Sequence, residues 1–222
     1  MESSGEKDLI LKHLGLKDYN EVWDLQKQLF DTLLYSKLKG ETSLPNYLIT
    51  CQHPHVITMG KSANESNIQI AEFPGVKYVR IDRGGDITYH GPGQLVVYPI
   101  LDLENYNLSL RNYIFLLEQA VIETLADFSI QAGRIKEYTG VWVDFESKRP
   151  RKIAAIGVKT SRHITMHGLA FNINPDLNYF NLIIPCGIRD KEVTSLEKEF
   201  SGNIDFDSVC QLFVTKFLNL LK

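Results

Sequence analysis

Short runs of β-type residues fill the middle of this chain, and they restrict its fold more than any other feature. YLITC, VITM, VKYVRI and LVVYPIL are each a few residues long, and Gly, Pro or polar residues separate them. Apolar residues at helical spacing follow Asp18, Ser109 and Asp205 instead. Because strand-like and helical segments do not alternate regularly, we predict an α+β protein. In this architecture, helices pack on one face of a mixed or antiparallel sheet.

Capping residues mark the ends of the predicted helices. Asp18 precedes the first helix, and Glu21 stands three residues later, as a capping box requires. Gly40 suits the end of this helix. Ser109 and Asp205 occupy the starting positions of the second and the last helix.

Composition excludes several classes of protein. A hydrophobic content of 44% with 23% charged residues is ordinary for a globular chain, and a net charge of −3 gives no reason to expect nucleic-acid binding. No apolar run approaches the ~20 residues of a membrane span, and MESSGEKDLIL lacks the pattern of a signal peptide. Three scattered cysteines make no disulfide framework. We expect one domain over residues 1–222, with a disordered tail over 1–8, as a cytoplasmic monomer.

One stretch combines many glycines with polar side chains. Residues 83–103 read RGGDITYHGPGQLVVYPILDL and end in an apolar run that predicts a buried strand. Adjacent glycines let a backbone approach a ligand closely or adopt positive φ. Arg83 and His90 stand beside them, which favours a binding loop. A glycine-rich turn between two core strands fits the same spacing equally well.

Three further segments carry residue types that a site could use. His53 and His55 invite a metal interpretation, but no Cys/His/Asp pattern completes a ligand set, so we expect a loop that lines a pocket and no metal. RHITMHGLAFNIN, residues 162–174, predicts a pair of strands with a His-Gly turn. IAAIGVK, before it, predicts a strand of small residues that leaves room for a ligand.

The three cysteines differ in their surroundings. Cys51 lies within a strand-like run, and Cys210 lies on the apolar side of the last helix, where a buried thiol is the usual outcome. Cys186 lies between Pro and Gly after an apolar run, in a turn that would present it. Its position alone also fits a small buried side chain.

A reactive thiol needs a lowered pKa, which a nearby cation supplies. Lys152 at the start of a strand is one candidate for that cation, and His90 and His167, each just before a glycine, are the others. A Cys–Lys pair would provide a nucleophile together with a base that exchanges protons with an amine. Spacing alone leaves the choice among the three open.

Several blocks together resemble the lipoyl(octanoyl) transferases, the octanoyl-[acyl-carrier-protein]:protein N-octanoyltransferases of lipoate synthesis. The blocks are GLKDYNEVWDLQ, HPHVITMG, RGGDITYHGPGQLVVYPILDL, KIAAIGVKTSRHITMHGLAFNIN and FNLIIPCGI, and they run in the family's order from Gly15 to Ile188. The resemblance implies the catalytic-domain fold shared with biotin protein ligases and lipoate ligases. It also implies transfer of an octanoyl group from a carrier-protein thioester to a lysine amine, through an acyl-enzyme thioester.

Matching the family's motifs implies a role for particular residues. The motif PCG places the nucleophile at Cys186, and KIAAIGV places the catalytic lysine at Lys152. The implied substrate-binding positions are Arg83, Gly84, Gly85, Asp86, Ile87, Thr88, Tyr89, His90, Ala155, Ile156, Gly157, Gly168, Leu169 and Ala170.

The resemblance also implies the partners. The donor is octanoyl-acyl carrier protein, and the acceptors are lipoyl domains of 2-oxoacid dehydrogenase complexes and the glycine cleavage H protein. We expect no cofactor, since one thioester replaces another without ATP, and neither nucleic acid nor membrane as a partner. Small residues, among them Ala154, would leave a slot for the acyl chain, and backbone N–H groups around Gly168 would stabilise the oxyanion.

A basic cluster is the candidate docking surface for an acidic carrier protein. It comprises Lys148, Arg149 and Arg151, with Arg134 and Lys136 nearby. A solvated basic turn without a partner explains the same residues equally well.

Two other functions remain open. An ATP-dependent lipoate or biotin ligase would share the fold, but it would not need a Pro-Cys-Gly nucleophile, and no adenylate-binding signature stands out. A module that only binds lipoyl domains would never carry an acyl group on Cys186. A requirement for ATP and a trapped acyl adduct would separate the three functions.

Overall fold

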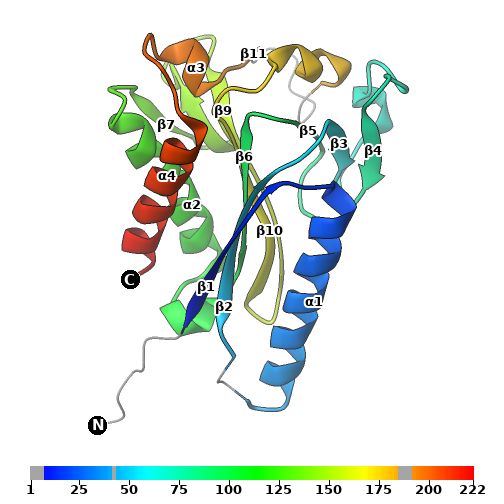
Figure 1. Cartoon of the computed structure of the whole chain (residues 1–222), viewed down its shortest axis with the longest axis vertical. Coiled ribbons are helices and arrows are strands. Elements are labelled where there is room, and N and C mark those ends of the chain that lie inside the picture. Colours follow the sequence, from blue (N-terminus) through cyan, green and yellow to red (C-terminus); the bar gives the residue numbers. More distant parts are fainter. Residues whose placement is uncertain (1–7, 42–43, 185–191) are drawn as a thin grey trace.

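The computed structural model describes residues 8–41, 44–184 and 192–222. Among them, a mixed eight-stranded sheet forms the centre of the molecule (Figure 1). Its strands are β1 (Leu9–Leu16), β2 (Asn46–Gln52), β6 (Gln94–Ile100), β7 (Ala132–Ile135), β8 (Tyr138–Val143), β9 (Arg151–Ser161), β10 (Ile164–Asn172) and β11 (Glu192–Val193). They lie in the order β1-β2-β6-β10-β9-β8-β7, and β11 pairs in parallel with the start of β9. The predicted α+β class is confirmed.

Helices cover both faces of this sheet, so the prediction of helices on one face is wrong. They are α1 (Tyr19–Leu38), α2 (Leu110–Ala126), α3 (Leu196–Glu199) and α4 (Phe206–Leu221). Helix α1 packs on β6 and β10 from one side, while α2 packs on β8, β9 and β10 from the other and carries α4 (Figure 1). None of the described helices combines the length and the hydropathy that a membrane span requires.

Strand β6 explains why the sheet needs two layers of helices. Its side chains alternate, with Leu95 and Val97 in the core under α2 and α4, and Val96, Tyr98 and Ile100 in the core under α1. A strand buried on both faces reads as a continuous apolar run, which is what LVVYPIL is. The predicted buried strand is therefore confirmed.

A second, three-stranded sheet lies beside the first. It is formed by β3 (Val56–Met59), β4 (Lys77–Arg80) and β5 (Ile87–His90), in the order β4-β3-β5. Three short 3₁₀ helices complete the connections, at Glu65–Asn67, Leu103–Tyr106 and Leu177–Leu182. The loop from β4 to β5 contains the glycines that follow Arg83, so this second sheet holds both ends of that loop.

The predicted helix starts are confirmed by their caps. The side chains of Asp18, Ser109 and Asp205 each accept a hydrogen bond from a backbone N–H in the first turn of α1, α2 and α4, respectively. Gly40 follows the last helical turn of α1 with φ of +76°, a conformation that suits glycine. Near the other end of the chain, Glu192–Val193 forms β11, and the short helix α3 follows it over Leu196–Glu199.

The segment RHITMHGLAFNIN is one strand, so the predicted pair of strands with a His-Gly turn is wrong. Strand β10 runs without interruption through His167 and Gly168, and the turn from β9 is at Arg162 and His163, which both have positive φ. Gly168 is required by close packing, because a Cβ atom there would lie 2.1 Å from the carbonyl oxygen of Val97. A turn at Gly168 that offers its N–H groups to an oxyanion is therefore absent.

Candidate functional site

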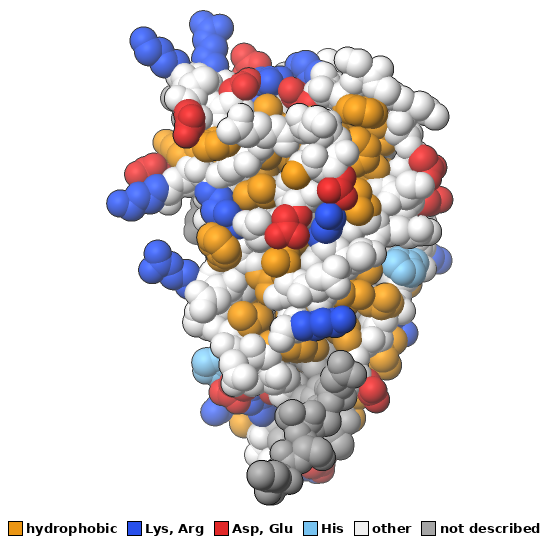
Figure 2. Space-filling view, turned by 90° about the vertical axis from the view of Figure 1, so that its left-hand side faces the viewer, with side chains coloured by type: hydrophobic (Ala, Val, Ile, Leu, Met, Phe, Trp, Pro, Cys, Tyr) orange, Lys and Arg blue, Asp and Glu red, His pale blue; other side chains and the backbone are white. Residues whose placement is uncertain are grey.

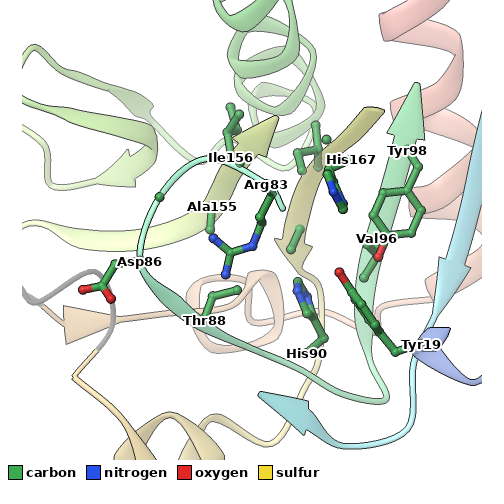
Figure 3. Close-up of a pocket in the computed structure, with 15 residues that line it drawn as sticks. Tyr19, Arg83, Asp86, Thr88, His90, Val96, Tyr98, Ala155, Ile156 and His167 are labelled. Atoms are coloured by element: carbon green, nitrogen blue, oxygen red, sulfur yellow. The ribbon is translucent and has the colours of Figure 1, made fainter. Parts of the chain in front are cut away.

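Strands β9 and β10 form the floor of a cavity between the two sheets. Ala155 pairs with Ala170 and Gly157 pairs with Gly168, so two cross-strand pairs of small residues lie near each other. All four line the cavity, together with the loop that follows β4 (Figure 3). Ala154 does not contribute, because it belongs to the core under α2 and α4.

The Arg83 side chain lies across this floor. Its guanidinium donates hydrogen bonds to the carbonyl oxygen of Thr58 at 2.9 Å, to Thr58 Oγ1 at 3.0 Å and to the carbonyl oxygen of Gly84 at 3.0 Å. Gly157 makes room for it, since a Cβ atom there would lie 3.0 Å from both Arg83 Cδ and the Gly84 oxygen. A planar, permanently charged group is thus fixed inside the cavity.

His90 reaches the same cavity from the end of β5. Its Nδ1 donates to Gln94 Oε1 at 2.7 Å, and its ring stacks on Tyr19 with centroids 5.9 Å apart. Burial, reinforced by the neighbouring His53, lowers the pKa of His90 to about 3. At neutral pH this imidazole is uncharged, so it cannot supply the cation that a reactive thiol needs.

His167 is the buried member of a polar cluster whose other members, Asp82 and Lys159, are partly exposed. Its Nε2 lies 2.9 Å from Asp82 Oδ1, and Lys159 Nζ lies 2.6 Å from Asp82 Oδ2. The hydrogen bonds from His167 and Lys159 hold the pKa of Asp82 well below its ordinary range. Burial lowers the pKa of His167, although Asp82 opposes the shift. His167 is therefore also neutral at pH 7, like His90.

Lys152 lies on β9, at the edge of an adjoining cavity. Its Nζ donates to the carbonyl oxygen of Thr139 at 3.2 Å and lies 4.6 Å from the centroid of the Trp142 ring. Ala155 and Ala170 line this small cavity as well as the larger one, so the two cavities adjoin. Burial lowers the pKa of two of the three candidates for the cation beside the thiol, His90 and His167, which leaves Lys152 as the third candidate.

The structure brings most of the predicted substrate-binding residues together. Three of them do not line the cavity. Gly84 turns its backbone toward Val158, and Ile87 and Tyr89 point into the core of the second sheet, as alternation along β5 requires. The eleven that do line it are Arg83, Gly85, Asp86, Thr88, His90, Ala155, Ile156, Gly157, Gly168, Leu169 and Ala170.

Sequence reasoning missed several polar residues of the cavity. Tyr19, at the start of α1, and Tyr98, on β6, both line it (Figure 3). Asp82 stands behind His167. The sequence offers two local signals: Tyr98 is a polar residue within the apolar run of β6, and Asp82 is an acidic residue just before Arg83. Neither signal indicates that the residue lies near the cavity.

Cys186 lies outside the described residues. The two described cysteines, Cys51 and Cys210, are both buried, and burial raises the pKa of each thiol. Neither has the surroundings of a reactive thiol.

The described residues hold no group of three or more His, Cys, Asp or Glu side chains arranged for a metal ion. His53 is committed to the protein itself, since its Nδ1 donates to the carbonyl oxygen of Lys17 at 2.8 Å and its Nε2 lies 2.8 Å from the Tyr98 hydroxyl. His55 Nδ1 likewise lies 2.7 Å from the Tyr89 hydroxyl.

The predicted basic cluster is only partly available to a partner. Arg151 forms ion pairs with Asp144 and Glu199, and Arg134 pairs with Glu118 at 2.8 Å. Lys136, Lys148 and Arg149 remain exposed.

Known proteins resemble this chain throughout most of its length. The model of the lipoyl protein ligase A/B catalytic domain matches residues 18–218. An octanoyltransferase of Bacteroides fragilis is 51% identical over 86% of this chain and 88% of its own. A bi-partite lipoate protein ligase of Thermoplasma acidophilum has a TM-score of 0.68 at 15% identity, over 97% of this chain and 84% of the other. A biotin protein ligase of Aquifex aeolicus has a TM-score of 0.53 at 15% identity, over 97% and 70%. The predicted ligase-like fold is confirmed.

Proposed function

Because the chain belongs to the family of the lipoyl protein ligase A/B catalytic domain, we propose that it is an octanoyltransferase of protein lipoylation. It takes an octanoyl group from the thioester of acyl carrier protein and transfers it to a lysine amine of a lipoyl domain. One observation carries this proposal. A cavity floored by glycine and alanine leads to Lys152, in a chain whose relatives bear the name octanoyltransferase.

The reaction proceeds in two balanced steps. The Cys186 thiolate attacks the donor carbonyl, a new thioester forms, and the carrier's thiol leaves with a proton. The acceptor amine then attacks the acyl-enzyme, an amide forms, and the Cys186 thiol is restored as the amine loses its proton. The first step exchanges one thioester for another, so the donor already holds the free energy that ATP supplies to a ligase. The ammonium of Lys152 favours the thiolate.

The described residues on either side of Cys186 support its place beside Lys152. Phe180, six residues before it, and Val193, seven residues after it, both line the small cavity that contains Lys152. Val193 also pairs with Lys152 in the sheet. Described residues on both sides of the proposed nucleophile in the sequence therefore lie at the cavity that contains Lys152.

The acyl chain extends from this point along the small residues of β9 and β10. Seven carbons beyond the carbonyl stabilise the bound state by about 0.8 kcal/mol for each methylene removed from water. Ala155, Gly157, Gly168 and Ala170 offer no side chain that would fill this path.

Intact-mass analysis tests the proposal directly. The protein is incubated with octanoyl-acyl carrier protein without ATP, and wild type is compared with Cys186→Ser. We expect an octanoyl adduct on the wild type that a lipoyl domain then removes, and no thiol-labile adduct on the variant. An ATP-dependent ligase would transfer octanoate only when ATP is added, and a binding module would acquire no adduct under either condition.

The exposed residues of the basic cluster, Lys136, Lys148 and Arg149, form the proposed docking surface for the acidic carrier protein. Figure 2 shows the face over α2 and α4, from whose edge Lys and Arg side chains project into solvent. Exposed charges act on encounter with a charged partner and are screened by salt. Arg151 is excluded from this surface because its charge is used within the protein.

Charge reversal tests the docking surface. In the double variant Lys148→Glu and Arg149→Glu, we expect the KM for the carrier-protein donor to rise about tenfold at low salt. The dependence of KM on salt should become flatter. Lys39→Glu, at an exposed position after α1, is the matched control and should keep both values. An unchanged KM in the double variant would exclude this surface.

A further inference from the structure

The cavity changes from apolar to polar along its length. Ala155 and Ala170 border the part that contains Lys152, the Gly157–Gly168 pair follows, and Val158 then pairs with His167. In Figure 3, His167 lies across the Arg83 side chain from Ala155, on the same side as Tyr19 and Tyr98. The end of the cavity farthest from Lys152 is therefore lined by polar rings.

His167 is fixed in position at this end of the cavity. The Asp82 carboxylate accepts the Nε2 proton at 2.9 Å, which leaves Nδ1 of the neutral ring with a lone pair. Nδ1 is buried and has no hydrogen-bond partner among the described residues. The ring is held in place from behind, since Gln26 Oε1 accepts the backbone N–H of His167 at 3.0 Å. This contact stabilises a backbone with φ of +61° within the strand.

We propose that His167 determines the length of the acyl chain that this site accepts, with Asp82 and Gln26 as its positioning residues. The inference rests on the proposed function and deepens it. The His167 ring lines the cavity and is held by Asp82, so a chain that reaches it meets a fixed side chain in a closely packed site, where overpacking is costly. Chains that end before His167 avoid this cost.

Strand geometry places that limit near eight carbons. Lys152 and Val158 are six residues apart on β9, which corresponds to about 20 Å at the usual rise of a strand. An octanoyl chain has seven C–C bonds, each of about 1.5 Å, and spans at most about 10 Å. The lysine side chain occupies part of the remaining length. The methyl end of an octanoyl group then lies near the Gly157–Gly168 pair, and two further carbons bring it to His167.

The test compares octanoyl and decanoyl groups on acyl carrier protein as donors. His167→Gly removes the ring and tolerates the positive φ. We expect the ratio of kcat/KM for decanoyl over octanoyl to rise about tenfold, as two more buried methylenes would provide. His163→Gly is the matched control, because His163 also has positive φ but is exposed in the β9–β10 turn. Its ratio should equal that of the wild type.

The possible outcomes separate this inference from the proposed function. Should His167→Gly keep octanoyl transfer with an unchanged ratio, or lose both donors equally, His167 does not determine length and the inference is overturned. Should the variant fail to fold, His167→Asn takes its place, since Asn is tolerated at positive φ and is shorter than His; the ratio must rise there too. A wild type that transfers neither chain overturns the proposed function itself, and this inference with it.

Discussion

Lys152 is positioned by contacts with two neighbouring groups. The carbonyl oxygen of Thr139 accepts its hydrogen bond, and the face of the Trp142 ring lies 4.6 Å from Nζ. The two histidines that could have served instead, His90 and His167, are neutral because they are buried. The sequence left three candidates for the cation beside the thiol. The burial of the two histidines narrows them to Lys152.

A substitution of Lys152 should remove chemistry and leave the fold. Lys152→Met keeps the length of the side chain but removes its charge and its protons, so we expect octanoyl transfer to fall about 10²–10⁴-fold. The thermal midpoint should stay close to that of the wild type, because Nζ is at the edge of a cavity. Lys39→Met controls for the loss of a surface charge. Wild-type turnover in Lys152→Met would remove this residue from the mechanism.

At the scale of elements, the β9–β10 pair positions the site. A bulge at the start of β9, between the pairs Val141–Ala154 and Trp142–Lys152, turns both Ile153 and Ala154 toward the core. Lys152 and Ala155 therefore line the same small cavity, although they are three residues apart. Simple alternation would have put them on opposite faces of the strand.

Gly168 joins this pair to the rest of the sheet. In Gly168→Ala, the added Cβ would lie 2.1 Å from the backbone oxygen of Val97, which cannot move independently of β6. We expect a loss of about 3 kcal/mol or more in the free energy of unfolding, measured by urea denaturation. Gly40→Ala is the control, with positive φ in open space, and should cost about 1–2 kcal/mol. Equal losses in the two variants would show that β6 and β10 separate easily.

At the scale of the whole molecule, the class of fold and most of the cavity-lining residues could be predicted from the sequence. The long periodic helices, their caps and the apolar run of β6 have local signals that tertiary packing reinforced. The His-Gly turn was wrongly predicted because a glycine that permits close packing looks the same as one that permits a turn. Tyr19 and Asp82 come to the site through packing between distant segments, which no local pattern encodes.

Acid sensitivity is a property that the molecule as a whole should show. Burial lowers the pKa of His53 to about 4 and that of His90 to about 3, whereas both ionise near pH 6.5 once unfolded. Between these values the unfolded chain binds more protons than the folded one, so stability rises with pH. The stability that these neutral rings contribute is complete above about pH 6.5 and is lost as the pH falls toward their folded pKa values.

We therefore expect the thermal midpoint of the wild type to fall steadily from pH 6.5 to pH 4, followed by circular dichroism. His53→Gln removes one of the two buried rings and should flatten this slope, even though it loses the hydrogen bonds to Lys17 and Tyr98 and starts from a lower midpoint. His163→Gln, at an exposed histidine, should retain the wild-type slope. A midpoint that stays constant across this range would mean that water reaches the buried rings in the folded state, and that the cavity is less enclosed than its hydrogen bonds imply.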